Sequence, residues 1–473
     1  MNADARAGTD KSRILIVCPH YPPSTEVGAR RVSALAKTLS DDGYEILVLS
    51  AFGEPYDFAR HPLSGEPISV GLAEPKPLLL SRLVLLKKFL QGLARRSAQP
   101  ALYTSPGRRP AATTAPISSA QISQAEGTGL LSRLTGKVLA WVGVLDHFKK
   151  WSWLAYRYGL RLCRAKRPAL IIASGPPFSA VLAASRIARR CGLPFIADFR
   201  DPIGSPGKSA SLAERFEQHV ARRAETYLAN TADWLTTASP GTAAVLGTRS
   251  ADARQKLSVI TNGFDGPLLA RSVSTGHQLN IVFAGALYLN RSPYIFLGAL
   301  ESLLHDANID SSRVVVKFFG AIESVEWRAL QSWLVGKKSQ LVMQIFPEVP
   351  LSQLKPHLES AGVTLNFAQW QPNQIPAKTF EQLRLGCEQI AVCEANSDTA
   401  KLLDNLAGMH VVEPTDIKRM NAILVDLYAR HVGRGLLTMP NPAQIQEFSR
   451  TEQNRKFSAL IRQIAGPPGT SNR

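Results

Sequence analysis

The N-terminal part of the chain alternates apolar runs with a polar segment of helical spacing. Residues 13–23 form an apolar run that enters a proline-rich loop, and residues 45–52 form a second apolar run. Residues 28–45 between them predict a helix, because apolar positions recur on one face: Val32, Leu35, Ala36 and Leu39. Strand, loop, helix and strand in this order predict a βαβ unit, which implies a parallel sheet.

The same rhythm returns later in the chain. Apolar runs at 169–174, 194–201 and 234–239 alternate with helical patterns at 178–192 and about 211–231. After a restart at 279–287, further strands are predicted at 314–321, 341–349, 362–368, 389–395 and 409–414. We therefore expect an α/β protein with two doubly wound, Rossmann-like domains. The expected parts are a disordered segment 1–12, an N-terminal domain 13–265, a C-terminal domain 266–440 and a closing helix 441–466.

A basic insertion, residues 76–167, interrupts the first domain after a loop-like stretch at 53–75. Residues 78–96 place leucines on one helical face with Lys and Arg beside them, and the composition of 97–128 predicts a flexible linker. The insertion holds 17 Lys and Arg against two acidic residues, so it carries most of the net charge of +18. Such a block indicates an anionic partner, membrane lipid or nucleic acid, or else a solvated basic insertion.

Length and composition exclude several classes of protein. The chain has 473 residues, 45% of them hydrophobic, which is enough for two or three domains. Its five cysteines include no pair at zinc-ligand spacing, and their odd number argues against a disulfide framework. We therefore expect reduced thiols and a cytoplasmic protein. The N-terminus lacks the apolar core of a signal peptide, and the run at 138–145 is shorter than the ~20 residues that span a bilayer.

Candidate sites in open α/β sheets lie beyond the carboxyl ends of the strands. Neither half contains a GxGxxG or a GxxxxGK[ST] motif, which argues against an NAD enzyme and a P-loop NTPase. In the first half, Gly28 precedes a helix whose amides can receive an anion, although a tight turn would also need glycine. Asp198, Arg200 and Asp201 follow a strand in DFRDP, a pattern that by itself slightly favours an ion-pair network.

Two further candidates lie in the second half. Gly285 permits close backbone approach in the loop after a strand, and Arg291 in the same loop can bind a phosphate, although a lone loop arginine is usually solvated. At residues 374–386, QIPAKTFEQLRLG, Pro376 suits a helix start. Lys378 opposes the helix dipole there, and an anionic ligand would remove that conflict. Glu381, one turn later, can accept hydrogen bonds from vicinal hydroxyls, or it can form a surface pair with Lys378.

In this order, the segments resemble a GT-B glycosyltransferase, and most closely the family-4 group of nucleotide-sugar-dependent enzymes of bacterial polysaccharide biosynthesis. Residues 13–50 resemble the N-terminal unit of that group, and residues 174–202 resemble a middle segment. VITNGFD at 259–265 resembles the end of its first domain, and IPAKTFEQLRLG at 375–386 resembles the donor-site helix. The resemblance covers roughly residues 13–52 and 168–450 and leaves most of the insertion out.

The resemblance implies a nucleotide-sugar donor bound by the C-terminal domain. Glu381 would bind the ribose hydroxyls, and Arg291 and Lys378 would neutralise the diphosphate as the leaving group gains charge. Gly285 would also lie at the donor, and Gly28 would bring the N-terminal loop close to it. The resemblance further implies a hexosyl transfer that retains anomeric configuration, with no cofactor and no metal.

The resemblance also implies an acceptor on the N-terminal side, where Asp198, Arg200 and Asp201 would lie. Polysaccharide-building relatives use lipid-linked glycan acceptors, so a basic N-terminal insertion suits a peripheral position on an anionic membrane. The leucine face of 78–96 could instead pack on its own domain. We expect no nucleic-acid partner, because no binding motif accompanies the charge.

Three positions depart from the family pattern. Asn373 stands eight residues before Glu381, where the family often has a second glutamate, and it belongs to the expected donor-binding set. Ala286 stands where a basic residue often follows the glycine, and Arg200 stands where a histidine is frequent. These departures leave open a non-catalytic nucleotide-sugar-binding homologue. A nucleotide-sugar epimerase or hydrolase is the other alternative, because such enzymes can share this two-domain architecture.

Overall fold

The computed structural model describes residues 12–24, 27–51, 68–71, 146, 148–204, 212–269, 277–287, 291–320, 325–435 and 437–468. The predicted helix at 78–96, the linker at 97–128 and nearly all of the segment 1–12 lie outside these residues. Within the described part of the chain, no helix is long and apolar enough to cross a membrane.

A seven-stranded parallel sheet forms the core of the N-terminal domain, as far as the structure describes it, in the order β3-β2-β1-β4-β5-β6-β7. The strands are β1 Arg13–Val17, β2 Glu45–Ser50, β3 Ile68–Gly71, β4 Leu170–Gly175, β5 Phe195–Phe199, β6 Trp234–Thr237 and β7 Leu257–Val259. The order reverses between β1 and β4, so the switch point, where ligands of such folds bind, lies beyond the ends of these two strands.

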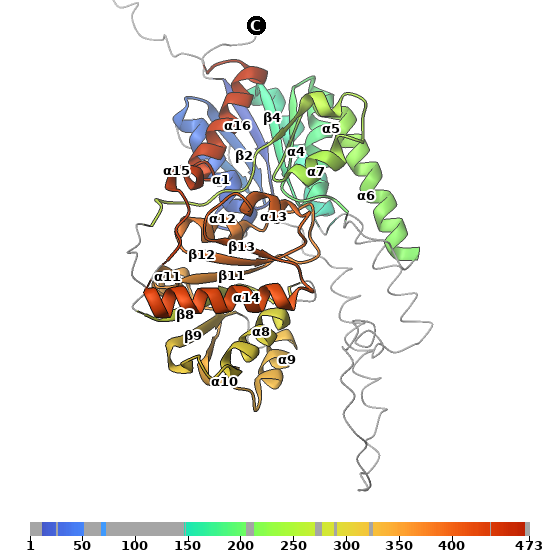
Figure 1. The fold of residues 1–473 in the computed structure, drawn as a ribbon. Coiled ribbons are helices and arrows are strands. Elements are labelled where there is room, and N and C mark those ends of the chain that lie inside the picture. The colour runs from blue at the N-terminus through green and yellow to red at the C-terminus, as the bar shows by residue number, and fades with distance from the viewer. Residues whose placement is uncertain are drawn as a thin grey trace, which may run out of the picture.

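Helices cover both faces of this sheet (Figure 1). They are α1 Val27–Asp41, α4 Lys149–Lys166, α5 Phe178–Cys191, α6 Leu212–Thr231, α7 Pro240–Leu246 and the short 3-10 helix η2 Ala253–Lys256. Successive residues of β1 enter different cores: Leu15 packs with the α4 and α5 side, and Ile14 with the α1 side. Because both faces are covered, the strands read as continuous apolar runs in the sequence.

Two parts of the N-terminal domain differ from the expectation. Residues 68–71, expected within a loop, form the edge strand β3, which is too short to show a periodic pattern. Helix α4, assigned to the insertion 76–167, is a core element, because Trp151 and Leu162 are buried in the same cluster as α5. The Trp151 Nε1–H donates to the Ser50 carbonyl at 3.2 Å, which ties α4 to the end of β2.

The C-terminal domain repeats the same winding. Its described strands form a six-stranded parallel sheet in the order β10-β9-β8-β11-β12-β13. These are β8 Leu279–Ala284, β9 Val314–Phe319, β10 Met343–Phe346, β11 Val363–Phe367, β12 Glu388–Val392 and β13 Met409–Val412. The order reverses between β8 and β11. The predicted fold class, α/β with two doubly wound domains, is therefore confirmed.

The helices of this half complete the layers. They are α8 Tyr294–His305, η3 Ser311–Arg313, α9 Val325–Leu334, α10 Ser339–Val342, α11 Leu351–Glu359, α12 Ala377–Arg384, α13 Asp398–Leu403, α14 Ile417–Tyr428, the π-helical η4 Ala429–Arg434, α15 Pro442–Gln446 and α16 Arg450–Ala465. The single closing helix expected at 441–466 is two helices. The break follows from Phe264, whose N–H donates to the Phe448 carbonyl and whose carbonyl accepts from Arg450 N–H, so the chain cannot stay helical there.

The end of the chain returns to the N-terminal domain, where α16 lies beside α1 (Figure 1). Phe457 and Ile461 of α16 are buried in the core that contains Val32 of α1. The Tyr44 hydroxyl donates to the Gly466 carbonyl at 2.7 Å. The α15–α16 segment therefore links the two domains a second time, in addition to the connection that follows β7.

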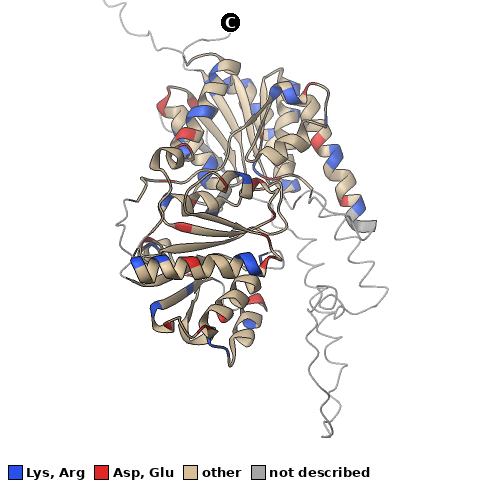
Figure 2. Ribbon diagram, in the orientation of Figure 1, with Lys and Arg blue, Asp and Glu red and all other residues tan. Residues whose placement is uncertain are grey.

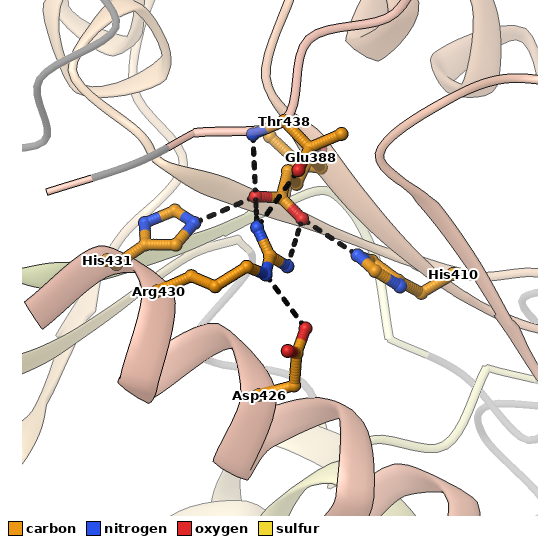
Figure 3. A network of polar contacts seen from close by, with 7 residues as sticks. Glu388, His410, Asp426, Arg430, His431 and Thr438 are labelled. Atoms are coloured by element: carbon orange, nitrogen blue, oxygen red, sulfur yellow. Dashed lines mark hydrogen bonds and ion pairs between the residues drawn. The ribbon is translucent and has the colours of Figure 1, made fainter. Parts of the chain in front are cut away.

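A buried carboxylate joins several elements of the C-terminal domain at the end of the sheet where β12 begins (Figure 3). Glu388, the fully buried first residue of β12, accepts two hydrogen bonds from Arg430, one from the Thr438 N–H and one from each of the rings of His410 and His431. Burial alone would raise the pKa of Glu388, but these partners outweigh it and hold the pKa well below its ordinary value. The network joins β12, β13 and η4.

Candidate active site

The switch point of the C-terminal domain brings Gly285 and Lys378 together. Gly285 directly follows β8, and its φ of +146° lies in a region that favours glycine. A Cβ atom at Gly285 would lie 3.8 Å from the Lys378 Nζ, so the backbone after β8 passes directly over this ammonium group. The loop after β8 and the start of α12, which are far apart in the sequence, thus meet at one point, as the fold class predicts.

Lys378 is the second residue of α12, which begins after Pro376. The residue is partly exposed, but its Nζ is buried and has no hydrogen-bond partner among the described residues. Burial, and then the nearby charge of Arg291, lower the pKa of Lys378 from 10.5 to about 7. Its nearest favourable contact is the ring of Phe283, whose centroid lies 4.8 Å from Nζ.

This arrangement suits an anion. Two cations, Arg291 and Lys378, lie close together at the positive end of a helix, although their charges repel each other. No ion pair joins Lys378 to Glu381 in this described region, so the alternative of a surface pair between them is wrong. A phosphate-sized anion between the cations would satisfy the buried Nζ and remove the repulsion.

Glu381 lies one turn further along α12, on the side of the connection between the domains. Its side chain is 39% exposed, and its closest cation is Arg384, with 3.9 Å between Glu381 Oε2 and Arg384 Nε. Burial, and then the nearby carboxylate of Asp265, raise the pKa of Glu381, and Arg450 is among the cations that oppose this shift. Sequence patterns missed Asp265 and Arg450 as neighbours, because they come from the domain connection and from α16.

In the N-terminal domain, Asp198 has a different partner from the one expected. The pairing of Asp198 with Arg200 is wrong, because Arg31 of α1 binds the Asp198 carboxylate through Nε at 3.1 Å and Nη2 at 2.9 Å. Hydroxyls of Ser174 and Thr236 donate to the same carboxylate at 2.7 and 2.8 Å. Burial alone would raise the pKa of Asp198, but these bonds hold it below its ordinary value. Asp198 therefore joins strands to α1 and is not free to bind an acceptor.

Arg200 lies at the N-terminal switch point. Its Nη2 donates to the Pro176 carbonyl after β4, and its guanidinium lies against Gly28 at the start of α1. A Cβ at Gly28 would collide with the guanidinium, so this glycine makes room for Arg200. The Nη1 of Arg200 is buried without a hydrogen-bond partner among the described residues. Burial raises the pKa of the neighbouring Asp201, and the charges of Arg200 and Arg31 oppose this.

Asn373 belongs to a polar contact between the domains. Its backbone carbonyl accepts from the Ser239 hydroxyl at 2.5 Å and from the Thr242 hydroxyl at 2.9 Å, both at the start of α7. Beside them, Gly241 N–H donates to Asp398 Oδ2 at 2.6 Å. The carboxyl-end loops of the two sheets thus touch directly. Asn373 lies in this interdomain contact, and a glutamate in its place would bring a second carboxylate near Asp398.

Replacing Gly241 with alanine is expected to separate the domains without unfolding either of them. The new Cβ would lie 2.6 Å from the Asn373 Oδ1 and 2.7 Å from Asp398 Oδ2. Both distances are shorter than van der Waals contact allows, so the two domains must move apart. We expect a larger radius of gyration by small-angle scattering, and misplacement of the domains should cost about tenfold or more in any reaction whose groups come from both domains. Gly433→Ala is the matched control, because a Cβ there meets nothing within 4 Å. Identical scattering for Gly241→Ala and the wild type would contradict the contact.

The chain matches the model of one protein family, described as glycosyl transferase 4-like domain, over residues 28–263. This region is about half of the chain and contains Gly28, Arg31, Asp198, Arg200 and Asp201. A search of curated proteins finds no match.

Solved structures with the same fold include glycosyltransferases. Anabaena Alr3699/HepE in complex with UDP and glucose aligns with a TM-score of 0.55 and 11% identity, covering 96% of this chain and 100% of that one. Sucrose-phosphate synthase from Thermosynechococcus elongatus aligns with a TM-score of 0.56 and 13% identity, covering 96% and 99%. The lipopolysaccharide outer core galactosyltransferase WaaB in its apo form aligns with a TM-score of 0.52 and 11% identity, covering 95% and 99%. Together with the family match, this fold shows that the chain belongs to the glycosyl transferase 4-like family of GT-B glycosyltransferases.

Proposed function

We propose that this chain transfers a hexose from a nucleotide sugar, with the donor diphosphate bound at Arg291 and Lys378. The observation that carries the proposal is the Nζ of Lys378 beside Gly285, which is buried and has no hydrogen-bond partner in the part of the chain that the structure describes. A UDP sugar is the donor we propose, and the complex of Alr3699/HepE with UDP-glucose supports this choice of nucleotide.

The proposed chemistry needs little from the protein beyond fixed positive charge. As the bond between sugar and diphosphate breaks, negative charge grows on the leaving group, and preorganised cations stabilise it most at that stage. Arg291, Lys378 and the amino end of α12 supply this charge without a metal or another cofactor. We further propose that the transfer retains the anomeric configuration, as the family resemblance implies.

The acceptor we propose is a glycan on a lipid carrier, used in cell-surface polysaccharide biosynthesis at the cytoplasmic side of a membrane. Arg200 and Asp201 are the acceptor-side groups, because the buried Nη1 of Arg200 lies at the N-terminal switch point. The excess of basic residues between 76 and 167 supports an anionic membrane as a second partner.

A non-catalytic nucleotide-sugar-binding protein is the second candidate, and the neutral side chain of Asn373 favours it. An amide side chain stands where the expected glutamate would be, so this position supplies no carboxylate; the bonds from Ser239 and Thr242 go to its backbone carbonyl. Turnover decides between the candidates. Release of UDP that depends on an added glycolipid acceptor supports transfer, release without any acceptor supports hydrolysis, and binding without release supports the non-catalytic candidate.

A thermal-shift series tests the donor site. Ligand binding raises apparent stability in proportion to the logarithm of ligand concentration over Kd, so UDP should raise the melting temperature more than UMP, and uridine should raise it least. Equal shifts for UDP and uridine would place the diphosphate elsewhere and overturn the proposal.

Glu381→Ala is expected to weaken UDP binding by about 1–3 kcal/mol, the scale of lost hydrogen bonds to a charged group. The reason is that Glu381 accepts from the ribose hydroxyls in the proposed complex. Calorimetry with UDP and 2′-deoxy-UDP isolates this contact, because removing the 2′-hydroxyl should weaken wild-type binding more than it weakens the variant. If the two losses simply add, Glu381 does not bind that hydroxyl.

A further inference from the structure

Helix α4 has two unlike faces. Trp151, Ala155, Gly159 and Leu162 are buried toward the sheet and α5. The fit is close, since a Cβ at Gly159 would lie 2.4 Å from Ile187 Cδ1. The core of the domain therefore fixes the orientation of the opposite face of α4, and the backbone positions of the side chains on that face are fixed with it.

That outer face combines aromatic and basic side chains. Trp153 and Tyr158 are 57% and 38% exposed, which is unusual for such large apolar groups. The Arg157 guanidinium lies 5.0 Å from the Trp153 ring centroid, and Arg161 lies 6.0 Å from that of Tyr158. Both aromatic side chains are thus held against arginines at the surface.

Helix α5, which packs beside α4, is also basic. Within their described bounds α4 contributes six basic residues and α5 three, and neither helix contains an acidic residue. The exposed arginines of α5 are Arg186, Arg189 and Arg190. The next helix, α6, mixes acidic and basic residues along its length (Figure 2). The one-signed charge is therefore shared by α4 and α5 and is absent from α6.

We propose that the outer face of α4, centred on Trp153, Arg157, Tyr158 and Arg161, docks the enzyme on a bilayer that contains anionic lipids. Tryptophan and tyrosine prefer the headgroup region, where an apolar ring meets water, and basic side chains are attracted to anionic headgroups. Single-stranded nucleic acid fits this face less well, because it needs open ring faces for stacking, and the arginines lie over these rings.

The position of α4 relates this surface to the acceptor. The ring of Phe148, which immediately precedes α4, packs edge-on against His20 in the loop after β1, with 5.0 Å between centroids. That loop lies at the N-terminal switch point, on the side of Arg200. Docking through α4 would therefore hold the acceptor side near the lipid surface. This consequence rests on the proposed lipid-linked acceptor, whereas the docking itself does not.

Vesicle flotation of the full-length protein tests the inference. We expect binding to phosphatidylcholine vesicles with 30% phosphatidylglycerol and little binding to pure phosphatidylcholine. The double variant Arg157→Glu, Arg161→Glu should bind the anionic vesicles at least about tenfold more weakly, because each basic residue near the surface contributes about 1 kcal/mol. Trp153→Ala, Tyr158→Ala should lose the part of the binding that survives high salt.

Lys418→Glu, Arg419→Glu is the matched control, because it makes the same charge change on exposed residues of α14 in the other domain. A thermal-shift measurement with and without UDP is made on every variant. The melting temperature without UDP reports folding, and the shift caused by UDP reports the donor site. Wild-type flotation that both α4 variants retain would overturn the docking face. Absence of wild-type flotation, or stronger binding to single-stranded RNA that the α4 variants abolish, would overturn the membrane partner. Loss of the UDP shift alone would count against the donor site and leave the docking face standing.

Discussion

Replacing Lys378 with methionine is expected to raise the melting temperature of the ligand-free protein while removing most of its affinity for UDP. Methionine has a similar length and no charge, so it removes the cost of a buried ammonium group that has no hydrogen-bond partner within the described ranges. The fall of the pKa from 10.5 to about 7 sets an upper limit of about 5 kcal/mol on this gain, at about 1.4 kcal/mol per pKa unit. UDP affinity should fall about tenfold to a hundredfold, the effect of losing a charged hydrogen bond.

The pH dependence of both effects follows from the lowered pKa. In the unfolded chain Lys378 keeps its charge up to about pH 10.5, whereas in the folded protein it loses the charge above about 7. The free-energy cost of burying the Lys378 ammonium group is therefore complete below pH 7 and shrinks as pH rises toward 10.5. The difference in the free energy of unfolding between variant and wild type should shrink in the same pH range. UDP binding has the opposite requirement. It needs the charged lysine, so wild-type affinity should fall as pH rises above 7.

Scanning calorimetry and titration calorimetry between pH 6.5 and 9 measure these effects. Lys401→Met is the matched control, since Lys401 is exposed on the neighbouring helix α13 and should leave both quantities unchanged. A lower melting temperature for Lys378→Met, or UDP affinity equal to that of the wild type, would show that Lys378 stabilises the fold and does not bind the donor.

Replacing Glu388 with glutamine is expected to destabilise the C-terminal domain by about 3–5 kcal/mol, the usual cost of removing one partner from a buried ion pair. The side chain keeps its shape, but an amide group then faces donors on Arg430, His410, His431 and the Thr438 N–H. One oxygen cannot accept all of these hydrogen bonds, so at least one buried donor loses its partner.

The sign of the acid dependence can be checked on the same variant. The pKa of Glu388 in the folded protein is held below its ordinary value of 4.5. The ionised side chain therefore contributes fully to the free energy of unfolding above that pH, and this contribution is lost as pH falls below it. Glu388→Gln should therefore remove part of the acid sensitivity of the wild type. The measurement is the unfolding transition of the C-terminal domain by scanning calorimetry at pH 4 and pH 7. Glu447→Gln on the surface serves as control, and an equal effect of both variants would contradict the network.

The fold could be predicted from the sequence because its signal is local. The apolar runs at 13–17 and 170–175 are strands buried on both faces, and such strands are recognisable without knowledge of their neighbours. The secondary structure predicted from the sequence was less accurate where elements are short or where a tertiary contact interrupts a helix. The four-residue strand β3 has no periodicity to detect, and the break between α15 and α16 depends on Phe264, far away in sequence.

The candidate site was predicted to a different extent in each domain. Lys378 stood out because a lysine at the start of a helix is unfavourable, and the structure places it beside Arg291 and Gly285. In DFRDP the sequence slightly favoured an ion-pair network around Arg200, whereas Arg31, the partner of Asp198, lies 167 residues away. Sequence distance favoured the wrong pair, since any of the nearby arginines could satisfy a carboxylate.

The sequence alone therefore determined the two doubly wound domains and the residues at the ends of their strands, because hydrophobic periodicity and helix-start chemistry act over a few neighbouring positions. Only the tertiary structure decided which of those residues meet. It assigned Gly28 to the space under Arg200, Asn373 to the contact between the domains, and Trp153 and Tyr158 to an exposed basic surface. These outcomes depend on long-range packing, in which one helix turn more or less would bring different side chains together.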